Sequence, residues 1–160
     1  MSTKPNQQIN IRKATPKDWK IIQKLNHQAM TANFQYDDHH KPDWEFAEKG
    51  EKFFKKIVDD QKQFCLIAML DKKPVGYLNG YQKIQGHRNI KIAEIENVAV
   101  IPPHQSQGIG SQLITKFKKW CQQKNITHLY VSVYFTNKRA VNLYNKLGLK
   151  PIDIGLEGRI

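Results

Sequence analysis

The sequence predicts one α/β domain in which a mixed central sheet is covered by helices on both faces. Its 160 residues have the length of one ordinary domain, and 39% of them are hydrophobic, enough for a sizeable core. The apolar residues switch between the two-residue period of strands and the three- to four-residue period of helices. The resulting order is strand, two helices, three strands, helix, strand, helix and strand. This order requires both antiparallel and parallel neighbours in the sheet.

The first part of the chain is expected to contain a short strand and two helices. Residues 9–12 alternate in polarity, as a half-buried strand does. A threonine N-cap and a proline at the first helical position then predict a helix over residues 16–31. The aromatic, histidine-rich and acidic stretch 33–43 has no clear period and predicts a loop. Apolar spacing predicts a second helix over residues 44–59.

The remaining strands are predicted after this second helix. Residues 64–70 and 75–83 flank a polar turn and form a candidate hairpin, and 90–101 is the next strand. A stripe of apolar residues predicts a helix over 108–124, with its lysines largely outside the stripe. A strand, a short helix closed by a glycine, and a last strand are then predicted over 128–133, 137–147 and 149–154.

The charge of the chain favours an anionic partner. Lys and Arg number 26 against 14 Asp and Glu, a net charge of +12. Residues 101–160 hold 9 basic and 2 acidic side chains, so the excess is concentrated there. Nucleic acid, an anionic membrane surface and a phosphorylated cofactor all fit this bias. The sequence contains no recognised nucleic-acid motif, so a solvated lysine face is favoured over a nucleic-acid interface.

Membrane insertion, export and disulfide bonding are not expected. The longest apolar run, residues 64–70, is too short for a bilayer span, and residues 1–5 lead into polar residues rather than a signal-peptide core. Cys65 and Cys121 lie in apolar segments and form no C-x-x-C pair, which predicts buried, reduced thiols. We therefore expect a cytoplasmic protein with no membrane association.

Residues 94–113 form the most informative segment, in which a strand enters a glycine-containing turn and then a helix. Gly108 and Gly110 remove Cβ atoms at the mouth of the helix, so several backbone N–H groups can converge on an anion. No Gly-Lys-Ser or Gly-Lys-Thr follows, which excludes a nucleotide P-loop. Leu113 stands where a dinucleotide fingerprint needs a third glycine. The turn is therefore a candidate phosphate cradle of another kind.

Residues 105–110, Gln-Ser-Gln-Gly-Ile-Gly, resemble the signature of the GNAT superfamily of acyl-CoA-dependent N-acetyltransferases. That signature is Gln or Arg, two residues, Gly, one residue, then Gly or Ala. As in that family, the hexapeptide follows a Glu-containing strand and a proline turn. A second block, residues 137–149, resembles the family's Asn, Ala, Tyr and Gly-Phe pattern. Two departures are mild, since Gln105 replaces the commoner arginine and Leu149 the usual phenylalanine.

The resemblance covers roughly residues 9–154 and implies a single GNAT domain over residues 1–160. Its mixed sheet would have about six to seven strands, splayed after the fourth. It also implies acetyl-CoA as the co-substrate, no metal, and direct attack by an amine in a ternary complex. Small domains of this family often pair, so a homodimer is compatible with the resemblance, although no surface in the sequence specifies one.

The family's cofactor contacts can be carried over residue by residue. Amides of residues 105–111 would hold the pyrophosphate, and residues 98–100 would present an open strand edge to the pantetheine arm. One N–H near Val98 would stabilise the oxyanion of the thioester carbonyl. Asn137 matches a cofactor-contacting position, although it could equally be only the N-cap of its helix. The cofactor-binding candidates are Val98, Ala99, Val100, Gln105, Ser106, Gln107, Gly108, Ile109, Gly110, Ser111 and Asn137.

Three side chains are candidates for proton transfer. Tyr144 matches the family's general acid, which protonates the departing CoA thiolate, although its place on an apolar stripe also fits a core tyrosine. Glu94 and Glu96 share a face of a regular strand, and either could take the proton that the amine must lose. Glu94 matches the position of the base in some family members, whereas Glu96 is nearer the splay. Another residue, or no dedicated base, is the remaining alternative.

In the family that the chain resembles, the first two helices and their loop usually cover the acceptor amine, which implies residues 30–44 and parts of residues 77–85 here. Phe34, Tyr36, Asp37 and Asp38 combine aromatic rings and carboxylates, which suits a cationic amine by charge and cation–π contact. A solvated acidic loop fits these residues equally well. The two histidines that follow Asp38 would point in different directions and do not complete a coordination shell, so no metal is predicted.

The favoured function is transfer of an acetyl group from acetyl-CoA to a primary amine, most simply that of a small molecule. A second reading keeps the fold and changes the acceptor to a protein lysine or an N-terminal amine. A third, non-enzymatic reading is a basic nucleic-acid-binding module, motivated by the charge of the last third of the chain.

Overall fold

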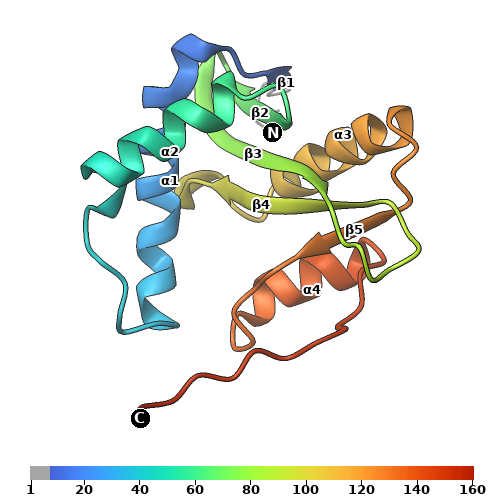
Figure 1. Ribbon diagram of the computed structural model, residues 1–160. Helices are drawn as coiled ribbons and strands as arrows, with labels where there is room; N and C mark the ends of the chain where they lie inside the picture. The colour runs from blue at the N-terminus through green and yellow to red at the C-terminus, as the bar shows by residue number, and fades with distance from the viewer. Residues whose placement is uncertain (1–7) are drawn as a thin grey trace, which may run out of the picture.

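The computed structural model describes residues 8–160, and its centre is a five-stranded sheet (Figure 1). Residues 1–5, which the sequence predicts not to form a signal peptide, lie outside the described part. The strands lie in chain order, with antiparallel pairing from β1 to β4 and parallel pairing between β4 and β5. Their bounds are β1 (Ile9–Lys13), β2 (Gln63–Leu70), β3 (Lys73–Lys83), β4 (Ile92–Val100) and β5 (His128–Val131).

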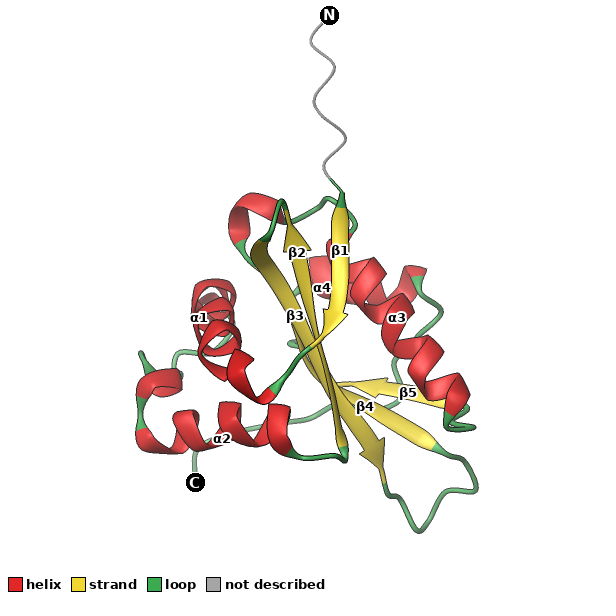
Figure 2. Ribbon diagram, turned by 90° about the horizontal axis from the view of Figure 1, so that it is seen from above, coloured by secondary structure: helices red, strands yellow, loops and turns green. Residues whose placement is uncertain are grey.

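Helices cover both faces of this sheet, as predicted (Figure 2). One face carries α1 (Trp19–Met30) and α2 (Glu48–Asp59), and the other carries α3 (Ile109–Gln123) and α4 (Lys138–Lys146). None of the helices within residues 8–160 is long and apolar enough to cross a membrane. Short 3-10 turns lead into or follow the helices and β4, at Pro16–Asp18, Thr31–Gln35, Trp44–Phe46 and Pro102–His104.

Two apolar layers hold the helices to the sheet. On the α3 side, Leu78 and Ile95 pack with Phe117, and on the α1 side Phe54 packs with Tyr77; all five are fully or almost fully buried. Burial of large apolar side chains on both faces is the main force that fixes the layers. The two cysteines, one in each layer, are buried and unpaired, which confirms the prediction of free thiols.

The predicted last strand, residues 149–154, is wrong, and the sheet has five strands rather than six or seven. The segment after α4 has no regular structure and runs along the outside of that helix (Figure 1). Ile152 and Ile154 alternate as in a strand, but they are 62% and 73% exposed. Pro151 before them has no N–H to give to a ladder. The alternating side chains of Ile152 and Ile154 therefore do not pack against the core.

β4 is the strand at which the sheet divides. It pairs with β3 along its whole length but with β5 only from Ile92 to Ile95. Beyond Ile95, the β5 side of β4 has no strand partner within residues 8–160, and Figure 1 shows the two strands moving apart. A register shift opposite Asn79 and Gly80 also inserts Glu96 as an extra residue, which is a β-bulge. The predicted splay after the fourth strand is thus present.

Asp18 fastens the start of the first helical segment to β1. Its buried carboxylate accepts two hydrogen bonds from Arg12 at 2.8 Å and one from the Thr15 N–H at 2.7 Å. The Arg12 guanidinium holds the pKa of Asp18 well below its usual range. The carboxylate is therefore ionised in the folded protein.

Replacement of this carboxylate in Asp18→Asn should lower the free energy of unfolding by about 1–3 kcal/mol at pH 7, because the charged hydrogen bonds of a buried carboxylate are lost. The folded-state pKa is depressed, so the wild-type advantage is full above about pH 5 and shrinks as the pH falls below about 3.9. Urea unfolding at pH 7 and pH 3 measures both values. Glu48→Gln, at an exposed site on α2, is the control. An equal deficit at both pH values would contradict the ion-pair explanation.

Candidate active site

A cleft of about 1450 Å³ opens where β4 and β5 separate. Its walls come from α1 and the segment after it, the end of β4, the turn before α3, the end of β5, and α4. It brings together nearly all of the residues that the sequence singled out. Three of these residues do not line the cleft, namely Asp38, Glu94 and Gln107.

The turn before α3 has the features of an anion cradle. Gly108 is the N-cap of α3, with φ +79°, and a Cβ at this position would meet no atom within 4 Å. The first hydrogen bond of the helix runs from the N–H of Gln112 to the Gly108 carbonyl at 3.0 Å. The N–H groups of residues 109–111 therefore have no partner within the helix, as at any helix N-terminus, and these three residues line the cleft.

Arg139 brings a positive charge to the same turn. This residue lies at the start of α4, and its guanidinium donates to the side-chain oxygen of Gln105. The amide nitrogen of Gln105 donates in turn to the Val100 carbonyl at 2.8 Å. Gln105 therefore ties the end of β4 and the start of α4 together at the mouth of the cradle. A phosphate group fits this donor set, which combines free amides, a cation and space above a glycine.

The free edge of β4 faces the cleft with backbone groups that no strand pairs within residues 8–160. The Ile101 N–H donates to the Val75 carbonyl of β3 at 3.0 Å, and N–H directions alternate along a strand. Val98 and Val100 therefore direct their backbone groups away from β3. The bond that Gln105 makes to the Val100 carbonyl agrees with this direction. The N–H groups of Val98 and Val100 are thus available to an extended, amide-bearing ligand lying beside β4.

The two candidate bases on β4 have different surroundings. Glu94 forms an ion pair with Lys83 at 2.6 Å and accepts a hydrogen bond from the Tyr81 hydroxyl at 3.1 Å, outside the cleft. Glu96 stands in the bulge, lines the cleft and accepts a hydrogen bond from Asn79 at 2.6 Å. Glu96 is open to the cleft, yet desolvation by the protein around it raises its pKa, while the bond from Asn79 acts in the opposite direction.

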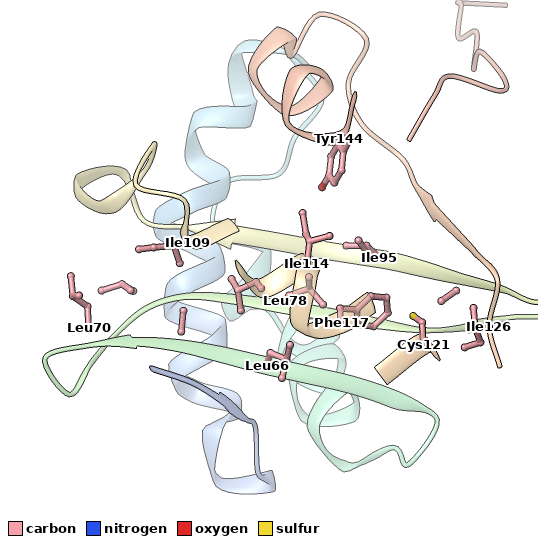
Figure 3. Packing of buried hydrophobic residues seen from close by; sticks show 14 residues of the cluster. Leu66, Leu70, Leu78, Ile95, Ile109, Ile114, Phe117, Cys121, Ile126 and Tyr144 are labelled. Carbon is pink, nitrogen blue, oxygen red and sulfur yellow. The ribbon is translucent and has the colours of Figure 1, made fainter. Parts of the chain in front are cut away.

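Tyr144 hangs from α4 toward β4, with its hydroxyl at the tip (Figure 3). The ring is buried at the edge of the core, and the residue also lines the cleft. Burial raises the pKa of Tyr144, and no hydrogen bond contributes to the shift. Its phenol therefore stays protonated over the ordinary pH range. Tyr144 therefore belongs both to the edge of the core and to the lining of the cleft.

Asn137 both caps α4 and lines the cleft. Its side-chain oxygen accepts a hydrogen bond from the Ala140 N–H at 3.1 Å, so it is the N-cap of α4. It also lines the cleft. The cap occupies only the oxygen, which leaves the amide NH₂ free to donate.

An aromatic and acidic cluster closes the cleft at the segment between α1 and α2. Tyr36 stacks on Tyr134 with ring centroids 5.8 Å apart, and the Tyr134 hydroxyl donates to Asp37 at 3.2 Å. His40 Nε2 lies 2.8 Å from the same hydroxyl, which fits an N–H donor. The His39 N–H and the Tyr134 hydroxyl hold the pKa of Asp37 below its ordinary value. Phe34 completes the cluster against His40, with centroids 5.3 Å apart.

Sequence reasoning singled out neither Tyr134 nor Arg139, and it included Asn79 only within the range 77–85, without a role. Arg139 stood inside the second family-like block, so its charge close to a phosphate cradle was a usable signal. Tyr134 lies more than 90 residues from its partners in the chain, and no local pattern pairs them. Asn79 reads as a polar residue within a strand, and only the register shift brings it to Glu96.

Comparison with known proteins agrees with this architecture. A family model described as the acetyltransferase (GNAT) family matches residues 23–149. An N-alpha-acetyltransferase of Sulfurisphaera tokodaii is 25% identical over 158 residues, which cover 94% of this chain and 86% of that protein.

Solved structures share the fold at lower identity. A mutant of a Bacillus halodurans protein has a TM-score of 0.80 at 19% identity and covers 94% of this chain and 99% of its own. The aminoglycoside N-acetyltransferase AAC(6')-Iy in complex with CoA has a TM-score of 0.73 at 16% identity, with 99% of each chain covered. The family match spans most of the chain and contains the cradle, the splayed strand and Tyr144. The protein therefore belongs to the GNAT family of acetyl-CoA-dependent N-acetyltransferases.

Proposed function

We propose that this enzyme transfers the acetyl group of acetyl-CoA to the primary amine of a small cationic molecule. The observation that carries the proposal is one continuous cleft, which runs from the N-terminus of α3, along the free edge of β4, to the cluster around Asp37. One end of the cleft suits a phosphorylated ligand and the other suits an ammonium group. Glu96 and Tyr144 line the stretch between them.

Backbone groups and Arg139 are suited to hold the cofactor. We assign the free N–H groups of residues 109–111 and the Arg139 guanidinium to the pyrophosphate. Val98 and Val100 would pair with the amides of the pantetheine arm, as an added strand does. The co-substrate supplies an acyl thioester, and the Val98 N–H would donate to its carbonyl oxygen as negative charge develops there.

We assign the role of base to Glu96 rather than Glu94. An alkylammonium has no lone pair, so a proton must leave it before nitrogen can attack the thioester carbonyl. Glu96 lines the cleft and has a raised pKa, which makes it a better proton acceptor than an ordinary carboxylate. Glu94 is occupied by Lys83 and lies outside the cleft. Glu96 would take the proton directly or through one water.

Tyr144 would act on the leaving group. As nitrogen bonds to the carbonyl carbon and the carbon–sulfur bond breaks, negative charge collects on sulfur. The Tyr144 phenol is protonated and makes no hydrogen bond that contributes to its pKa shift, so it can donate to that sulfur. The attacking nitrogen loses its second proton as the carbon–sulfur bond breaks, and this proton restores the Tyr144 phenol. The products are then the amide, the free thiol of CoA and the proton held by Glu96.

Charge and shape favour a small cationic acceptor. Asp37, Glu45 and Glu96 line the acceptor part of the cleft and outnumber Lys41, the one lysine there, in a protein of net charge +12. The stacked tyrosines beside Asp37 offer aromatic faces for a cation–π contact. The contacts of Tyr134 with Asp37 and His40 join the two sides of the cleft. A space bounded in this way suits a compact molecule better than a continuous polypeptide.

A protein N-terminal amine is the second candidate acceptor. It is favoured by the Sulfurisphaera relative, which is named an N-alpha-acetyltransferase and is similar over most of this chain. We further propose that residues 1–160 work as one catalytic domain, and that the enzyme acts in the cytoplasm, where its two buried thiols stay reduced.

An acceptor screen tests the proposal. Release of CoA from acetyl-CoA is followed with a panel of polyamines, aminoglycosides, amino acids and peptides with free N-termini, and mass spectrometry confirms the acetylated product. Transfer to a cationic small amine supports the proposal. Transfer to peptides alone would replace it with the N-terminal alternative.

The Tyr144→Phe variant should lower kcat about 100-fold, because the leaving sulfur loses its donor, while the Kd for acetyl-CoA changes little. Phenylalanine keeps the ring that packs between α4 and the core, so the fold is retained. Steady-state kinetics with the best acceptor and calorimetric titration with acetyl-CoA measure the two quantities. Unchanged kcat would show that Tyr144 has only a packing role.

The pair Asp37→Asn and Asp38→Asn tests which aspartate contacts the acceptor. Asp37 lines the cleft and Asp38 does not. The first variant should therefore raise KM for a cationic amine about tenfold, whereas the second should leave it within about twofold. Both should bind acetyl-CoA as the wild type does. Equal effects of the two changes would contradict a specific contact and indicate general electrostatic attraction.

A further inference from the structure

We propose that Asn79, a buried residue of β3, is a positioning residue that holds the Glu96 carboxylate in the orientation needed to take the proton of the amine. The inference rests on the proposed function, because it assumes that Glu96 is the base. Asn79 lies on β3, next to β4, and does not itself line the cleft.

The hydrogen bonds of Asn79 define its orientation. Its side-chain nitrogen donates to Glu96 Oε2 at 2.6 Å, and its side-chain oxygen accepts from the Asn97 amide at 3.3 Å. A carboxylate can only accept, so the NH₂ group must face Glu96 and the oxygen must face Asn97. The two bonds together fix the direction of the amide.

The bulge explains why Glu96 needs this support. Glu96 is the extra residue of β4 at the register shift, and it is open to the cleft. A long side chain at such a site has several rotamers, and a catalytic group must be held close to one geometry. The bond from Asn79 occupies Oε2 and leaves Oε1 free to receive a proton.

Burial argues that Asn79 has more than a packing role. Its relative exposure is 0%, and an amide at such a position costs free energy unless its bonds compensate. On the same strand, Leu78 is an ordinary apolar core residue. An apolar residue would fill the space at position 79 without the desolvation cost, but it could not hold a carboxylate in the bulge.

The charges around Glu96 set the direction of the expected pH effect. Desolvation raises its pKa most, and Glu94 on the same strand raises it further. The Asn79 bond lowers it, as does Lys56 from α2. Tyr77 and Tyr81, which flank Asn79 on β3, are both shifted to higher pKa and remain uncharged. Loss of the Asn79 bond should therefore raise the pKa of Glu96.

The Asn79→Leu variant removes both bonds and keeps the number and branching of the side-chain heavy atoms. We expect kcat to fall at least tenfold and the acidic limb of kcat/KM to move up by about 0.5–1 pH unit, because Glu96 must lose its proton to act as a base. The Kd for acetyl-CoA should stay within about twofold. The isosteric Asn79→Asp places a second carboxylate against Glu96 and should move the acidic limb of kcat/KM to still higher pH. This variant provides the same test if Asn79→Leu does not fold.

Two controls separate positioning from damage to the fold. Gln23→Leu removes a buried amide of α1 that bonds to the Glu45 carbonyl at 2.8 Å and does not line the cleft, and it should not move the acidic limb. In a Glu96→Gln background, Asn79→Leu should cost little further kcat, since Asn79 acts through Glu96.

Failure of the inference and failure of the proposed function give different results. An active wild type whose Asn79 variants keep its kcat and pH profile would overturn the positioning role alone. The positioning role would also be overturned if Asn79→Leu lowered kcat equally in the wild type and in the Glu96→Gln background. A wild type that binds acetyl-CoA but acetylates no amine would instead remove the proposed function on which the inference rests.

Discussion

The early end of the pairing between β4 and β5 is the constraint on which the rest of the site depends. Four residues of β4 pair with β5, and the strands then separate. Unpaired backbone groups on a strand edge are normally a liability, because they invite pairing with other chains. Here the exposed groups of Val98 and Val100 lie within a cleft, between α1 on one side and α4 on the other. The edge is therefore sheltered from other chains yet reachable by an extended ligand.

The bulge in β4 changes the direction in which the side chains of this strand point. One extra residue changes the phase of the side chains, so that Ile95 and Val98 both pack toward α3, while Glu96 and Asn97 both meet Asn79 on the other face. A regular strand could not place the free N–H of Val98 and the carboxylate of Glu96 in this relation. The Val98 N–H and the Glu96 carboxylate thus take their relative positions from one bulge, which β3 supports by pairing along the other side of β4.

The sequence was sufficient for the order of the elements as far as α4 and for the position of the glycine turn before α3, but not for Arg139 beside that turn. Periodicity located both helical layers, and the glycines of residues 105–110 indicated the cradle. It was not sufficient where a contact depends on register. Glu94 and Glu96 share a face, as regular alternation predicts. The sequence could not show that Lys83 engages Glu94 outside the cleft while Glu96, at the bulge, lines it. The strand predicted over 149–154 failed because alternation alone does not supply a face to bury.

Thermal unfolding with acetyl-CoA, CoA or ATP tests most directly that the splayed cleft is a cofactor site. A ligand at about 100 times its Kd adds about 2.7 kcal/mol of stability, which raises Tm by several degrees for a chain of this size. We expect a rise with acetyl-CoA and CoA and none with ATP. The rise should disappear in Gly108→Asp and persist in Gly86→Asp, since both glycines lie in open space but only Gly108 lines the cleft. No rise with saturating acetyl-CoA in the wild type would contradict a cofactor site in this cleft.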